Sequence, residues 1–190
     1  EEHLEHTMYD VQRSFEQAEE LAQQNTAELG DSYVAECNVD CDLRAYFPET
    51  YVPGASERML LYRELDGLSS DEEIAAFRQR LLDRFGALPT EAEELLRVVP
   101  LRRLGRRCGA ERLVLKAGNM TLYFVANAES PFYKSQVFQR VLDFALHPAQ
   151  MRRCELGEKK GKRFLRIKQM PSVEAAVKVL DYIVSPTAQP

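Results

Sequence analysis

The sequence predicts an α+β fold, in which a helical N-terminal half is followed by a ββαββα unit. Between residues 54 and 108 the apolar side chains recur at spacings of three and four, the period of amphipathic helices. After residue 110 the pattern changes to two strand–turn–strand segments, each followed by a helical segment. Such a unit packs economically as a mostly antiparallel four-stranded sheet with helices on one face. A length of 190 residues suits one domain, or one domain plus a fragment.

Residues 1–30 show one long helical pattern with a thin apolar stripe, and Gly30 supplies a C-terminal stop. His3 and His6 lie one helical turn apart, a spacing that a metal pair would also have, but we interpret them as solvated side chains. The sequence does not begin with Met, so we expect it to have been cut from a longer chain.

Residues 36–43 alternate between apolar and polar side chains, which predicts a short strand. Its inward face carries Cys37 and Cys41, and their spacing also suits two metal ligands. A zinc site would need two more soft ligands nearby, and neither Cys108 nor Cys154 has ligand spacing. We therefore expect four reduced cytosolic thiols and no metal site.

The helical half contains three candidate helix starts and one candidate break. Ser56 is the expected cap of the first helix, and Ser70 with Glu73 forms a capping box for the second. Thr90, followed three residues later by a Glu, repeats that pattern for the third helix. Pro100 lies inside the third helical pattern, so we expect a kink or an interruption there.

The second half consists of two similar units. Strands over 113–115 and 120–125 precede a helix over 137–145, and the hairpin that follows leads to a final helix capped by Ser172. The helical segments 140–146 and 178–184 echo one another. A structural duplication would produce this echo, and convergent amphipathic patterning would do so equally well.

Charge is distributed unevenly along the chain. Residues 1–100 contain 8 basic and 23 acidic side chains, whereas residues 101–190 contain 17 basic and 7 acidic ones. Such halves either pair with each other or face charged partners. A sequence pI near 5.4 argues against a dedicated nucleic-acid module. One helical face gathers four arginines that suit either internal salt bridges or bidentate contacts with an acidic partner: Arg102, Arg103, Arg106 and Arg107. For the basic hairpin turn 159–163 we favour a solvated surface.

The sequence contains no motif of a catalytic site. Phosphate-binding loops, the H-E-x-x-H zinc motif and nucleophile elbows are all missing from it. His147 sits at a predicted helix end, where we expect it to interact with the negative pole of that helix. Paired acids such as Glu93 and Glu94 lie in first helical turns, where the helix dipole accounts for them. We therefore expect a chain without enzymatic activity of its own and without a cofactor.

The sequence lacks an apolar run of about 18 residues and the pattern of a signal peptide. We therefore expect no membrane association, a cytoplasmic location and a monomeric fragment.

Residues 44–104 carry a specific combination of motifs: a Pro-bearing loop, the R-x-x-x-Y-R helix 58–63, the D-R-F-G-x-x-P turn 83–89, and a helix with L-R at 101–102. In this combination the chain resembles the C-terminal domain of the bacterial transcription-repair coupling factor (Mfd) family. The likeness covers roughly residues 36–184. It implies that 36–190 is the TRCF domain and that 1–35 is the helical segment that ends a preceding translocase domain.

The resemblance also implies a function. The parent would be an ATP-dependent DNA translocase, with ATP and Mg bound outside this fragment, that displaces stalled RNA polymerase and recruits UvrA. The domain itself would be a non-catalytic clamp that packs on the UvrB-like N-terminal module and masks its UvrA-binding surface. Carried over by position, the docking residues would be Asp83, Arg84 and Phe85, with Arg80 at a position where some family members carry an acid. The alternative is a basic-faced module that contacts DNA or RNA polymerase directly.

Overall fold

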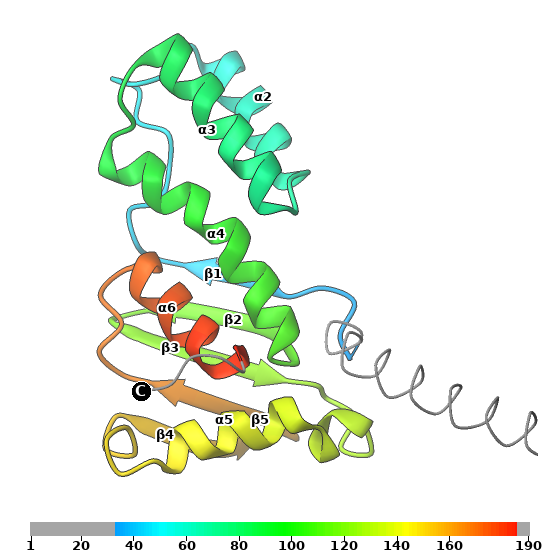
Figure 1. Cartoon of the computed structure of the whole chain (residues 1–190). Helices are drawn as coiled ribbons and strands as arrows, with labels where there is room; N and C mark the ends of the chain where they lie inside the picture. Colours follow the sequence, from blue (N-terminus) through cyan, green and yellow to red (C-terminus); the bar gives the residue numbers. More distant parts are fainter. Residues whose placement is uncertain (1–32, 186–190) are drawn as a thin grey trace, which may run out of the picture.

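The computed structural model describes residues 33–185 (Figure 1). The expected helix over 1–30, with His3 and His6, lies outside the described residues. The α+β class is confirmed, and the elements follow one another in this order: β1 (Asn38–Cys41), α2 (Ala55–Asp66), α3 (Asp71–Phe85), α4 (Thr90–Arg107), β2 (Ala110–Lys116), β3 (Asn119–Phe124), the 3-10 helix η2 (Pro131–Lys134), α5 (Gln136–Leu146), β4 (Cys154–Lys159), β5 (Lys162–Ile167) and α6 (Val173–Val184).

The sheet has five strands in the order β1-β2-β3-β5-β4. The expectation of a four-stranded sheet was wrong, because β1 joins it as a fifth, edge strand parallel to β2. The remaining neighbours are antiparallel. Parallel neighbours need a long crossover, and here the crossover is the whole helical segment α2–α4. The sequence pattern predicted this strand but not its place beside β2.

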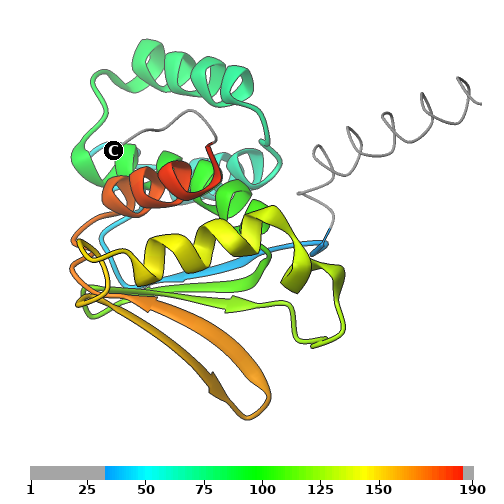
Figure 2. The same cartoon turned by 60° about the horizontal axis from the view of Figure 1, so that its bottom comes forward.

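The helices α4, α5 and α6 cover one face of the sheet, and no described element covers the other (Figure 2). Inward-facing residues of the strands, such as Leu113, Leu122 and Leu165, are fully buried beneath these helices. Gly109, with φ +75°, joins α4 to β2 under the ring of Phe132. A Cβ atom there would lie 2.2 Å from that ring, so only glycine fits this turn.

A second, smaller core lies among α2, α3 and the first half of α4. It contains Phe47, Val52, Phe77 and Leu81 together with residues of α4. The second half of α4 contributes Leu101 and Leu104 to the sheet core instead. One helix therefore belongs to both cores, and the expected interruption at Pro100 does not occur, because α4 runs from Thr90 to Arg107.

Two of the four predicted caps are confirmed. The hydroxyl of Ser70 accepts a hydrogen bond from the backbone N–H of Glu73, and that of Ser172 accepts one from Ala175. The caps at Ser56 and Thr90 were wrong, because the chain is still extended at Gly54 and Pro89 and both helices begin directly after those residues. The two side chains thus lie inside the first helical turn.

The four cysteines are free thiols. Burial in the sheet core raises the pKa of Cys37 and of Cys108 to about 12, and burial also raises the pKa of Cys41 and Cys154. At neutral pH these side chains behave as small apolar groups.

Candidate docking site on the helical region

Two exposed ion pairs link α2 and α3. Arg80 pairs with Glu64, and one turn further along α3 Arg84 pairs with Glu57. Both arginines are more than half exposed, so solvent screens the pairs and they contribute little to the free energy of unfolding. Each pair places a carboxylate of α2 next to a guanidinium of α3, so the positive charges of Arg80 and Arg84 are compensated within the domain.

Asp83 is the sequence-predicted site residue whose charge stays uncompensated. Its carboxylate accepts a hydrogen bond from Gln79 Nε2 at 2.9 Å, one turn earlier on α3, and forms no ion pair within the part of the chain that the structure describes. The neighbouring Leu82 exposes 37% of its surface. An oriented carboxylate beside an apolar side chain is a suitable contact for a cationic partner surface. Leu82 was not a predicted docking residue, because it fits the apolar spacing of three and four that predicts a buried helix face.

Phe85 plays a packing role at the end of the same helix. Its ring lies 5.6 Å from that of Tyr51 and joins the small core, and the guanidinium of Arg84 lies 5.1 Å from its centroid. The Tyr51 hydroxyl donates to the carbonyls of Leu81 and Gly86. These contacts fix the D-R-F-G turn, so the structure brings Arg80, Asp83 and Arg84 to the surface and leaves Phe85 half-buried.

The arginines of α4 are largely engaged within the chain. Arg103 donates to the Ser69 carbonyl at 3.0 Å and to Asp71 at 2.7 Å, and both acceptors lie between α2 and α3 or at the start of α3. Arg102 lies 3.9 Å from Asp66, in the last turn of α2. These contacts tie the basic face of α4 to the acidic half of the chain, which is one of the two outcomes expected from the charge distribution.

The remaining two arginines lie at the end of α4. Arg106 Nε donates to the Val34 carbonyl at 3.2 Å, and Arg107 is exposed in the last turn. Arg102, Arg103 and Arg106 line one side of a groove of about 770 Å³, whose other sides are residues 35–39 and 66–69.

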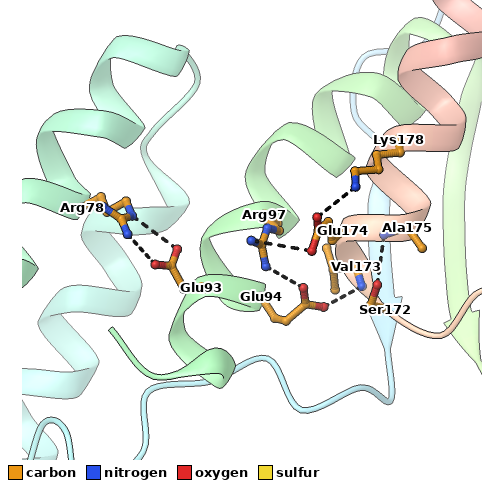
Figure 3. A network of polar contacts seen from close by, with 9 residues as sticks. All are labelled: Arg78, Glu93, Glu94, Arg97, Ser172, Val173, Glu174, Ala175 and Lys178. Atoms are coloured by element: carbon orange, nitrogen blue, oxygen red, sulfur yellow. Dashed lines mark hydrogen bonds and ion pairs between the residues drawn. The ribbon is translucent and has the colours of Figure 1, made fainter. Parts of the chain in front are cut away.

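Two adjacent acids on α4 reach in opposite directions (Figure 3). Glu93 makes a two-point contact with Arg78 of α3, at 2.6 and 3.3 Å. Glu94 is buried and accepts the backbone N–H of Val173 at 2.6 Å, at the start of α6, together with Arg97 at 2.8 Å. The dipole interpretation missed these partners, because a single sequence gives no sign of which helix end lies opposite a carboxylate.

Among residues 33–185, no group of three or more His, Cys, Asp or Glu side chains could hold a metal ion. In the same range no helix is long and apolar enough to cross a membrane. His147 caps the end of α5, and its Nδ1 accepts a hydrogen bond from the backbone of Ala149.

The chain is similar to known proteins in sequence and in fold. The TRCF domain matches residues 41–135, half of the chain. The transcription-repair-coupling factor of Rickettsia prowazekii (strain Madrid E) is 30% identical over 92 residues, which cover 48% of this chain and 8% of that protein. Those of Mycobacterium tuberculosis (strain CDC 1551 / Oshkosh) and Escherichia coli (strain K12) are 44% identical over 73 residues and 26% identical over 85 residues, covering 37% and 45% of this chain and 6% and 7% of those proteins.

The fold has a counterpart among solved structures. The crystal structure of the C-terminal domain of transcription-repair coupling factor matches with a TM-score of 0.61 at 17% identity, over 80% of this chain and 96% of that one. The range 41–135 that the TRCF domain matches contains the D-R-F-G turn and the helices α2 and α3, which carry the two ion pairs. The chain belongs to the TRCF domain family.

Proposed function

We propose that this domain is a non-catalytic regulatory clamp, which acts by occupying a surface of its parent protein. The observation that carries the proposal is Asp83, an exposed carboxylate in the D-R-F-G motif that is held in position by Gln79 and forms no ion pair with the residues that the structure describes. Its neighbours Arg80 and Arg84 are already paired across α2 and α3. The face therefore offers one directed negative charge together with the apolar side chain of Leu82.

The partner in this proposal is the UvrB-like N-terminal module of the same protein. By covering that module, the domain would mask its UvrA-binding surface and so inhibit the parent until the clamp is released. The matched segment covers only 6–8% of the curated relatives, so ATP and Mg binding, movement along DNA and the contacts with RNA polymerase and UvrA would belong to other parts of the parent. A cytoplasmic location follows from the same proposal.

The physical character of the face suits a clamp that must open. Two modules of one polypeptide meet at a high effective concentration, so a modest intrinsic affinity is enough to keep them closed. Contacts between exposed charges weaken as ionic strength rises and depend on the match of signs across the interface. A face of this kind releases more readily than a large apolar one.

The test is charge reversal at Asp83 with a matched control. The chain offers one, because Asp143 on α5 accepts a hydrogen bond from Gln139 Nε2 at 2.8 Å in the same one-turn geometry. We expect Asp83→Lys to weaken binding of a fluorescently labelled UvrB-like module by about tenfold or more, since the new charge faces a cationic surface. Asp143→Lys should leave the affinity within about twofold. Equal affinities for Asp83→Lys and the unaltered chain would contradict the proposal.

The alternative, in which the arginines of α4 contact nucleic acid or polymerase directly, finds no support in their geometry. Arg102, Arg103 and Arg106 have partners within the chain, and binding an external anion would first require breaking these contacts.

A further inference from the structure

The uncovered face of the sheet carries an aromatic pair on its two central antiparallel strands. Side chains alternate along a strand, so residues whose neighbours point into the core face the open side. Tyr123 on β3 and Phe164 on β5 are register partners on that side, next to Leu122 and Leu165, which form the adjacent register pair and are buried in the core. Their ring centroids lie 6.2 Å apart, and both side chains are partly exposed.

Gly157 makes room for one of these rings. It lies opposite Phe164 on the edge strand β4, and a Cβ atom there would lie 2.5 Å from Cζ of the ring. The Phe164 ring therefore extends across the backbone of β4. Covering of a glycine by a neighbouring ring is known to stabilise sheets, and it explains the position of Phe164. It does not explain why a second aromatic ring, that of Tyr123, lies on the open face, because the register partner of Tyr123 on β2 is Arg112 and not a glycine.

Basic residues surround the aromatic pair. Alternation places six of them on the open face, namely Arg112, Lys116, Lys159, Lys162, Arg166 and Lys168, against the acids Asp40, Asp42 and Glu155.

Some of these charges are compensated, and others are not. Arg112 and Lys116 both contact Asp40, at 3.2 and 3.0 Å, and Arg166 contacts Glu155 at 3.1 Å. Within residues 33–185, three lysines of the face form no ion pair: Lys159, Lys162 and Lys168. They lie on or directly after the hairpin β4–β5, which projects beyond the helices (Figure 2).

We propose that this open face is a binding platform for single-stranded DNA. Bases of a single strand present flat faces, which stack on aromatic rings and on guanidinium planes. Tyr123 and Phe164 supply two such rings, and the guanidinium of Arg166 lies 5.4 Å from the Phe164 centroid and extends the surface. The unpaired lysines supply positive charge for the phosphates. An antiparallel sheet with helices behind it and aromatics on its central strands is a general arrangement for holding unpaired bases.

The platform is independent of the clamp proposed above. Asp83 and its neighbours lie on α3, in the small core region, whereas the open face is the opposite side of the sheet (Figures 1 and 2). Only the choice of DNA over RNA rests on the proposed function, in which the parent works on DNA. Loss of one activity by mutation should therefore leave the other unchanged.

The experiment measures fluorescence anisotropy of a labelled oligothymidylate of about 15 nucleotides at about 50 mM salt, titrated with the whole chain. We expect saturable binding that weakens as salt rises. Tyr123→Ala and Phe164→Leu should each weaken it about fivefold or more, because each removes a stacking surface. Phe164→Leu keeps apolar cover over Gly157, so its effect reports on the ring rather than on folding.

Matched controls separate the platform from general effects of charge and exposure. Tyr182→Ala removes an exposed tyrosine from α6, and Lys134→Ala removes an exposed lysine from η2, both on the helical side of the sheet. Each should bind like the unaltered chain, whereas Lys162→Ala should weaken binding and reduce the salt slope by about one.

Three results would overturn the proposal. The first is no binding at protein concentrations up to about 100 μM, the weak end of nonspecific affinity. The second is unchanged affinity in Tyr123→Ala and Phe164→Leu, and the third is equal affinity for a duplex of the same length. Tighter binding of the matching RNA by about tenfold would overturn the assignment to DNA.

Discussion

The helical region and the sheet region of this domain expose charge in different ways. On α2 and α3, Arg80 and Arg84 pair with acids of the facing helix, whereas Asp83 forms no ion pair among residues 33–185. On the open face of the sheet, three lysines form no ion pair with any residue of the described range 33–185, and they lie around an aromatic pair. The uneven charge of the sequence is therefore partly neutralised inside the fold, so the charged surfaces left for partners are smaller than the sequence suggests.

The two regions also differ in how they are held together. The sheet region has a large core beneath three helices, whereas the helical region has a small one around Phe77 and Leu81. The helix α4 belongs to both cores. Two adjacent residues of this helix connect it to other helices: Glu93 contacts α3 and Glu94 contacts α6. We therefore expect the two regions to unfold together.

The largest effect is expected for Phe77→Ala, which creates a cavity in the small core. Phe77 is 1% exposed, and such truncations cost about 3–5 kcal/mol. Because α4 is shared, urea unfolding followed by far-UV circular dichroism and by tyrosine fluorescence should still give one coincident transition. Leu82→Ala, at an exposed position of the same helix, should change the free energy of unfolding by about 0.5 kcal/mol or less. Two separated transitions would show that the regions are independent.

A smaller effect is expected at the start of α6. Glu94→Ala removes the acceptor of the Val173 N–H and the partner of Arg97, and should lower the free energy of unfolding by about 2 kcal/mol. Glu93→Ala breaks only the more exposed contact with Arg78 and should cost about 1 kcal/mol or less. Urea unfolding of the two neighbouring variants measures this difference, and equal losses would mean that the buried contact adds nothing.

The smallest effect concerns the buried thiols at high pH. Burial raises the pKa of Cys37 from 9.0 to about 12, so the unfolded chain releases this proton first. The stabilising contribution is complete below pH 9 and is lost as pH rises towards 12, at up to about 1.4 kcal/mol per pH unit. Between pH 8 and 10 the free energy of unfolding should therefore fall more steeply for the unaltered chain than for Cys37→Ala. Parallel curves would contradict the burial of this thiol.

Local signals in the sequence predicted the elements that depend on local interactions. The capping residues Ser70 and Ser172 act within one turn of chain, so their patterns are readable without tertiary structure. The same logic misplaced the caps at Ser56 and Thr90, because the extended backbone at Gly54 and Pro89 set those helix starts. Pro100 is tolerated because packing on both sides keeps α4 continuous.

The α+β class, the periodicity of most elements and the motifs that mark the family can be predicted without the structure, since these depend on neighbours along the chain. Tertiary structure alone decided that β1 lies parallel to β2, that Glu94 meets the start of α6, and that Tyr123 lies beside Phe164. The partners in these three contacts are 74, 79 and 41 residues apart in sequence. No local pattern encodes such contacts, because they form only when the packing of two cores fixes which distant segments meet.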